Sequence, residues 1–161
     1  MKKAFLETLC CPICKGHLAL EKAEDFDEED IRSGTLLCST CGKRYGTRNG
    51  IPNFVIKECL ATTNVVQKLL YDIYAPFYDV VEEKLAKRAG FNEEALRREV
   101  TSSMDIRELD RVLEVCVGTG GNTPYFRKQT KELVVGLDLS NSMLEICRRK
   151  DEENKWKNME L

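Results

Sequence analysis

The sequence predicts an α/β protein in two parts: a small cysteine-rich unit, then the first half of a doubly wound parallel sheet with its helices. Three observations predict this fold class. Two Cys-x-x-Cys pairs lie in the first third of the chain, apolar residues recur at helical spacing over residues 62–103, and two short apolar runs flank a glycine-rich turn within residues 111–138. Strand-like runs that alternate with helical periods are typical of a sheet covered by helices.

The first part, residues 1–57, contains the pairs Cys11-Pro-Ile-Cys14 and Cys38-Ser-Thr-Cys41. Two intervening residues let both thiolates of a pair reach one ion, and four thiolates complete a tetrahedral zinc shell with no open position. A unit of about 50 residues with few apolar side chains buries little surface, and zinc binding can contribute on the order of 10–16 kcal/mol to its folding. We therefore predict a structural zinc site at Cys11, Cys14, Cys38 and Cys41.

Other interpretations of these cysteines remain open, namely a pair of disulfides or a redox couple. Cys10 competes with Cys11 for the metal, but only Cys11 keeps the two-residue spacing. We expect His17, the only histidine, in a loop, because four cysteines already suffice as ligands. The acidic stretch at residues 21–30 is expected to be a mobile loop, because like charges repel one another and stay solvated.

Three helices are expected between residues 62 and 103, at the start of the second part, which spans residues 62–161. A threonine at position 62 or 63 can cap the first helix, and Pro76 suits the first turn of the second. Asn92 is a good cap for the third.

The glycine turn lies between two predicted strands, residues 111–117 and 133–138, which are joined by a helix at 123–131. Gly118 and Gly120 permit a tight turn and a close approach of the backbone to a ligand, because neither carries a Cβ. Asp138 ends the second strand, and its carboxylate is expected at the same sheet edge as the turn. A glycine turn beside such an acid is typical of a nucleoside-binding half-site, in which the carboxylate accepts hydrogen bonds from a ribose.

Beyond the second strand, Ser142-Met-Leu-Glu145 is predicted to form a capping box for a helix that ends near residues 148–150. A third strand is expected within residues 157–161.

The residues around the turn favour S-adenosylmethionine over a dinucleotide. A dinucleotide fingerprint needs a third small residue where this chain has Thr123, so the pyrophosphate interpretation is weakened. Glu114, four residues before Gly118, would repel a pyrophosphate. The same carboxylate can help to hold a cofactor with a cationic ammonium or sulfonium group, and S-adenosylmethionine carries both.

The chain from about residue 71 to 161 resembles the class I S-adenosylmethionine-dependent methyltransferases. Glu114-Val-Cys-Val-Gly-Thr-Gly120 and Gly136-Leu-Asp-Leu-Ser-Asn-Ser-Met143 are similar to the first two motifs of that family, and Tyr74-Ala-Pro-Phe-Tyr-Asp79 to the segment preceding the fold in its ubiquinone/menaquinone C-methyltransferase-like branch. In this family, helices like those expected at 62–103 cover the cofactor pocket. The resemblance implies cofactor binding by Glu114, Gly118, Thr119, Gly120, Asp138 and Met143.

Within that set, the resemblance implies that the turn holds the methionine end of the cofactor, Asp138 the ribose and Met143 the adenine. A plainer interpretation of Met143 is a place in the helix core, and a βα turn without a ligand remains the alternative for the whole site. The family usually has Gly where this chain has Cys116. Because that position is expected to end the strand, we predict that binding survives.

The segment from Leu9 to Phe54 resembles the zinc-ribbon fold of the small activator subunits that partner tRNA and rRNA methyltransferases, which implies a protein partner. A ribbon also precedes the catalytic domain in the large-subunit rRNA guanine N1-methyltransferases, which makes RNA a substrate to consider. Lys43, Arg44 and Arg48 form a small basic cluster. The net charge of −2 and the sequence pI of about 5.6 nevertheless provide no broad positive field for phosphates.

We therefore expect an S-adenosylmethionine-dependent methyltransferase, or its cofactor-binding N-terminal portion, with an unidentified methyl acceptor. The alternatives are a non-catalytic zinc module that binds another protein and an RNA methyltransferase. The sequence stops before the fourth strand of a doubly wound sheet, so the domain is expected to be incomplete at its C-terminus, and no residue can be nominated as catalytic. Eight cysteines without a secretory signal or membrane-length apolar stretch lead us to expect a cytoplasmic protein without a membrane span.

Overall fold

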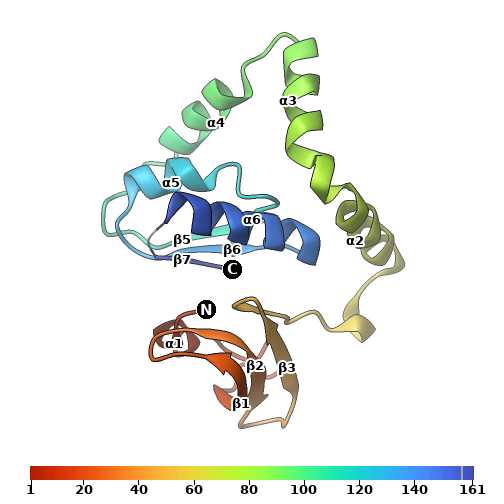
Figure 1. The fold of residues 1–161 in the computed structure, drawn as a ribbon, viewed down its shortest axis with the longest axis vertical. Helices are drawn as coiled ribbons and strands as arrows, with labels where there is room; N and C mark the ends of the chain where they lie inside the picture. The colour runs from red at the N-terminus through yellow and green to blue at the C-terminus, as the bar shows by residue number, and fades with distance from the viewer. Residues whose placement is uncertain (157) are drawn as a thin grey trace. The chain divides into compact units, whose positions relative to one another are not determined.

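The computed structural model describes residues 1–156 and 158–161 (Figure 1). The chain separates into two compact units, one formed by Met1–Cys59 with Glu160–Leu161 and the other by Leu60–Met159. The first contains an antiparallel sheet and the second a parallel pair of strands with several helices. The predicted α/β fold class is confirmed.

The first unit is a four-stranded antiparallel sheet in the order β1-β2-β3-β4. Its core is small, because few apolar side chains alternate inward: Leu18, Ile31 and Leu36 are fully buried. The elements are α1 (Lys3–Leu6), β1 (Leu18–Phe26), β2 (Ile31–Cys38), β3 (Arg44–Arg48), β4 (Ile51–Pro52) and the 3₁₀ turn η1 (Lys57–Cys59).

The expectation of a mobile loop at residues 21–30 was wrong, because β1 and β2 extend into this stretch as a hairpin. Asp27 closes its turn by accepting a hydrogen bond from the backbone N–H of Asp30 at 2.8 Å. Arg32 pairs with Asp25 and Asp27, so part of the acidic charge is neutralised within the hairpin. The N–H of Asp30 and the Arg32 guanidinium lower the pKa of Asp27 to about 2. The like-charge argument failed because it ignored this cation on the neighbouring strand.

The second unit begins with helices, as the apolar spacing predicted: α2 (Thr62–Tyr74), the 3₁₀ turn η2 (Ala75–Phe77), α3 (Tyr78–Arg88) and α4 (Glu93–Ser102). The predicted cap of α4 is confirmed, since Asn92 Oδ1 accepts from the N–H of Ala95 at 3.0 Å. The predicted threonine cap of α2 is wrong. Ala61 holds the N-cap position there, with extended backbone and no side-chain cap.

A three-stranded sheet in the order β5-β6-β7 follows, with β5 and β6 parallel. Glu114, Val134 and Gly136 are buried, whereas Leu113 and Val115 on the alternate positions are 61% and 66% exposed. The helices of this unit therefore cover one face of the sheet. The elements are β5 (Val112–Val115), α5 (Thr123–Gln129), β6 (Val134–Leu137), α6 (Asn141–Asn154) and β7 (Met159–Glu160).

The start of α6 differs from the predicted capping box. Ser140 is the N-cap, and its hydroxyl accepts from the N–H of Met143 at 3.2 Å. Ser142 is already helical, so it cannot serve as the cap. The helix also runs to Asn154, past the predicted end near residue 150. The expected third strand is present as β7, while Lys157 lies outside the described residues.

Among residues 1–156 and 158–161, no helix combines the length and apolar character needed to cross a membrane.

One glycine of the antiparallel sheet provides a test of its packing. A Cβ on Gly34 of β2 would lie 2.5 Å from the carbonyl oxygen of Lys22 on β1, so the strands would have to separate. We expect Gly34→Ala to lower the free energy of unfolding by about 1–3 kcal/mol, measured by urea denaturation of the zinc-loaded protein with circular dichroism. Gly46→Ala on β3 is the matched control, because no atom lies within 4 Å of its added Cβ. Equal losses in the two variants would contradict the prediction.

Candidate functional site

The first candidate site is the cluster of four cysteines in the first unit. The Sγ atoms of Cys11, Cys14, Cys38 and Cys41 all lie within 4.8 Å of one another. The Cys11–Cys41 and Cys14–Cys38 sulfur pairs are 3.7 and 3.4 Å apart. Zinc–sulfur bonds of about 2.3 Å in a tetrahedron place sulfurs about 3.8 Å apart, so the cluster fits a zinc ion.

In each Cys-x-x-Cys pair, backbone amides of the turn donate hydrogen bonds to the sulfur of the first cysteine. Cys38 accepts from the amides of Cys41 and Thr40, and these bonds lower the pKa of its thiol. Burial acts to raise the pKa of Cys11, but hydrogen bonds from Tyr45 and two backbone amides outweigh it and bring the value to about 6. Metal binding requires thiolates, so these local turns favour the ligand form. All eight cysteines are free thiols, which argues against the disulfide interpretation.

The sequence analysis missed Tyr45 as a partner of this cluster. Its hydroxyl lies 3.0 Å from Cys11 Sγ, and its ring packs edge-on against Phe54 with centroids 5.1 Å apart. The side chain is only 4% exposed. Burial and the neighbouring thiols raise the pKa of Tyr45, so the hydroxyl stays protonated and can donate to a thiolate. The period-two pattern of β3, which turns Tyr45 and Thr47 inward, was the available signal.

The second candidate site is a cavity of about 320 Å³ in the second unit, which we call the nucleoside cavity. Three of the predicted cofactor residues line it: Gly118, Asp138 and Met143. Tyr71 of α2 and Tyr78 of α3 form part of the opposite wall, together with polar side chains of α2. The volume is within the range of about 300–1,000 Å³ that is usual for small-molecule sites.

Gly118 and Asp138 meet at one sheet edge, because β5 and β6 are parallel and end level with each other. The N–H of Gly118 donates to Asp138 Oδ2 at 2.8 Å, and the N–H of Ser140 donates to Oδ1 at 2.9 Å. Each carboxylate oxygen keeps a lone pair that can accept from a hydroxyl group. Gly118 has φ +56°, and no atom lies within 4 Å of a Cβ added there. The turn therefore leaves open space beside the acid.

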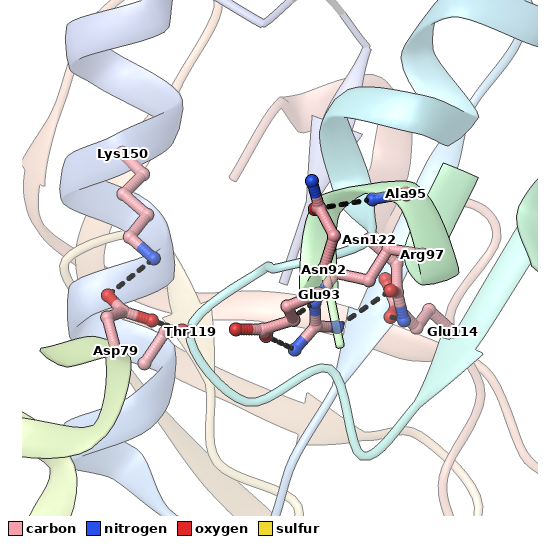
Figure 2. A network of polar contacts seen from close by, with 9 residues as sticks. All are labelled: Asp79, Asn92, Glu93, Ala95, Arg97, Glu114, Thr119, Asn122 and Lys150. Carbon is pink, nitrogen blue, oxygen red and sulfur yellow. Dashed lines mark hydrogen bonds and ion pairs between the residues drawn. The ribbon is translucent and has the colours of Figure 1, made fainter. Parts of the chain in front are cut away.

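The two residues that follow Gly118 face the protein interior rather than the cavity. Thr119 is 2% exposed and donates through its hydroxyl to Asp79 Oδ1 at 2.6 Å (Figure 2). A Cβ on Gly120 would lie 2.7 Å from Cys147 Sγ, so this glycine is needed for packing against α6. Neither residue lines the nucleoside cavity, unlike Gly118.

Glu114 is buried on the helix-covered face of β5, at the end of a polar chain (Figure 2). Its Oε1 accepts from Asn122 Nδ2 at 2.9 Å, and Asn122 Oδ1 accepts from Arg97 at 2.8 Å. Arg97 also pairs with Glu93 one turn earlier on α4. Gly121 makes room for this guanidinium, because a Cβ there would lie 2.8 Å from it. The sequence analysis missed this Arg97–Asn122 support, which joins residues far apart in the chain.

Burial raises the pKa of Glu114, although Asn122 and the positive charge of Arg97 act in the opposite direction. Its Oε2 atom is buried without a hydrogen bond of normal geometry to any described residue, while the nearby Thr123 hydroxyl helps to lower the pKa. A buried carboxylate oxygen in this state can be satisfied by a cationic donor. Glu114 is not among the residues that line the cavity.

The expectation that Cys116 ends the strand was wrong, because β5 stops at Val115 and Cys116 lies in the turn that follows. Cys116 has φ +60°, a left-handed conformation that favours glycine, and it lines the cavity. This backbone conformation explains why a glycine is usual at this position in the family that the segment resembles.

Comparison with known families finds two separate matches along the chain. Residues 112–161 match a methyltransferase domain family. Residues 2–50 match the family of Trm112p-like proteins, and neither match spans half of the chain. The chain thus combines a methyltransferase-domain segment with a Trm112p-like segment that carries the four-cysteine cluster.

Among solved structures, the YcgJ protein from Bacillus subtilis is similar to part of the chain, with 22% identity and a TM-score of 0.37. The similarity covers 40% of this chain and 27% of the YcgJ chain, so this chain spans about a quarter of that protein's length. No curated protein matches the chain.

The metal assignment can be tested by replacing neighbouring cysteines. We expect Cys14→Ser to lose the zinc that the wild-type protein binds at one ion per chain, because three thiolates leave the tetrahedron open. Cys10→Ser is the matched control and should keep the ion, since Cys10, unlike its neighbour Cys11, is not part of the four-cysteine cluster. Elemental analysis of protein purified without chelators measures both. Zinc loss from Cys10→Ser instead would overturn the assignment.

The buried carboxylate leads to a prediction for stability against pH. The pKa of Glu114 is higher in the folded protein than in the unfolded chain. Its favourable contribution to the free energy of unfolding is therefore complete below the pKa of the unfolded chain, and it is lost as pH rises through the pKa of the folded protein. We expect Glu114→Gln to melt at a higher temperature than wild type at pH 7, with a difference that shrinks toward about pH 4. Calorimetry from pH 4 to 7 measures this. Glu152→Gln, at an exposed position of α6, should show no such trend.

Proposed function

We propose that residues 62–161 form the cofactor-binding part of an S-adenosylmethionine-dependent methyltransferase. The observation that carries the proposal is the contact between Gly118 and Asp138 on the wall of the nucleoside cavity. In this proposal Asp138 accepts hydrogen bonds from the ribose, and Met143 lies against the adenine. The match of residues 112–161 to a methyltransferase domain supports this chemistry.

The turn after β5 would hold the methionine end of the cofactor. Gly118 offers open space there, and Thr119 and Gly120 fix the shape of the turn. In this proposal Glu114, buried on β5 before the turn, helps to hold the ammonium group. The bound cofactor supplies a sulfonium methyl group for transfer to a nucleophile. The protein's own contribution is to orient that group and exclude water, because such transfer depends mainly on positioning.

We also propose that the helices of residues 62–103 belong to the ubiquinone/menaquinone C-methyltransferase-like branch of the family. Two observations support this. Tyr78 of the Tyr74–Asp79 segment lines the cavity, and Asp79 binds the turn through Thr119.

The ribbon, residues 1–57, is proposed to be a structural zinc module. Its match to Trm112p-like proteins favours a second function beside cofactor binding, namely contact with a partner protein such as a methyltransferase. An RNA substrate has less support. Arg44, the centre of the small basic cluster, makes two 2.7 Å hydrogen bonds to Glu21, which neutralises part of the cluster's charge.

Ligand binding tests the cofactor proposal. We expect S-adenosylhomocysteine to bind the zinc-loaded chain, and Asp138→Ala to weaken it at least tenfold, since hydrogen bonds to a charged group contribute roughly 1.5–3 kcal/mol. Isothermal calorimetry measures both affinities. Glu145→Ala removes a carboxylate from an exposed position of α6 outside the cavity wall and should bind like wild type. A folded wild-type chain with no detectable affinity would refute the proposal.

A further inference from the structure

The helix α2, which supplies one wall of the nucleoside cavity, is held in place by very little apolar burial. None of its residues is buried. Its large aliphatic side chains are about half exposed or more, from 49% at Val65 to 66% at Ile73. Hydrophobic contact normally fixes an amphipathic helix onto its domain. Among the described residues, polar contacts therefore contribute much of the attachment of α2.

Asp72 provides the first such interaction. Its Oδ1 accepts from the Ser140 hydroxyl at 2.6 Å and from the N–H of Ser142 at 3.2 Å. Ser140 is the N-cap of α6 and follows Asp138, the proposed ribose ligand. Lys68, one turn earlier on α2, pairs with the other oxygen of Asp72. Asp72 thus ties α2 directly to the loop after β6, and its negative charge lies at the start of α6, where the helix dipole favours it.

Asp79 provides the second interaction, at the start of α3. Its Oδ1 accepts from Thr119 at 2.6 Å, and its Oδ2 pairs with Lys150 of α6 at 2.7 Å (Figure 2). Thr119 lies in the glycine turn after β5. The two aspartates therefore reach the two different loops that end the parallel strands of the half-site.

The two aspartates belong to a short repeat, Tyr71-Asp72 and Tyr78-Asp79, with seven residues between equivalent positions. The first pair lies near the end of α2 and the second at the start of α3, with the 3₁₀ turn η2 between them. In each pair the tyrosine lines the nucleoside cavity and the aspartate binds a loop of the half-site. Each tyrosine of the cavity wall is thus adjacent in sequence to an aspartate that attaches the segment to a loop.

We infer that Asp72 and Asp79 are latches that hold the α2–α3 segment closed over the nucleoside cavity and so control ligand release. They are positioning residues, because each acts through a loop rather than on the ligand. Asp72 is the stronger latch, since its side chain is 25% exposed, against 48% for Asp79. The inference rests on the proposed function for the identity of the ligand, but the attachment itself belongs to the free protein.

The dissociation rate of S-adenosylhomocysteine tests the latch. We expect Asp72→Ala to raise this rate about tenfold and Asp79→Ala about threefold, and the association rate to rise as well, because the segment must open both for release and for entry. Stopped-flow displacement measures the rates. Glu83→Ala, which removes only an exposed ion pair with Lys87 on α3, is the matched control. Unchanged dissociation rates in both aspartate variants would overturn the inference.

A double-mutant cycle separates a latch from a general loss of structure. If Thr119 acts only through Asp79, then Asp79→Ala and the double variant with Thr119→Val should release the ligand at the same rate, because Asp79→Ala already removes the contact with Thr119. If the increases in dissociation rate caused by the two single substitutions multiply in the double variant, the two residues act independently, which would count against the latch.

Hydrogen exchange of the ligand-free protein keeps the inference distinct from the proposed function. In Asp72→Ala, amides of residues 62–74 and 140–143 should exchange at least threefold faster than in wild type, with Glu83→Ala unchanged. If wild type binds no S-adenosylhomocysteine, the cofactor proposal fails, and this measurement alone decides the latch. Equal exchange in Asp72→Ala and wild type would overturn it.

Discussion

The candidate site depends on the register of the parallel strands β5 and β6, which end opposite each other. Because β5 and β6 pair in register from Val112 with Val134 to Val115 with Leu137, the residues after each strand emerge at one edge. That register places the N–H of Gly118 against the carboxylate of Asp138. A slip of one residue would turn the whole set of side chains to the other face and separate the two. The cavity, the cap of α6 and the attachment of α2 all follow from this edge.

The two units are stabilised by different means. The ribbon has a core of few apolar side chains, and its four sulfurs, supported by backbone amides and Tyr45, are arranged to bind an ion that contributes to folding. The second unit buries residues under α5 and α6 on one sheet face, while its helices α2 and α3 are attached largely through polar contacts. Polar attachment is weaker than a packed core, and a segment held in this way can open on a functional timescale.

Much of the fold could be read from local patterns. The strand runs, the Asn92 cap and the two cysteine knuckles are written in neighbouring residues, because turn and cap chemistry acts over three or four positions. Errors arose where the partner of a charge, or the residue that caps a helix, was assigned wrongly within a few positions. The acidic stretch at 21–30 became a hairpin because Arg32 pairs across it, and Ser140 rather than Ser142 caps α6 at the turn after β6.

The sequence alone determined which residues could form each site: four cysteines with the spacing of metal knuckles, and a glycine turn followed by a strand that ends in an acid. Spacing along the chain is sufficient there, because each motif is closed by its own backbone geometry. Only the tertiary structure decided which partners complete them. It brought Tyr45 to the sulfurs, Arg97 to the chain that ends at Glu114, and Asp72 to the loop after β6. These contacts join segments from 25 to 68 residues apart, and only the packing of strands and helices can bring such distant side chains together.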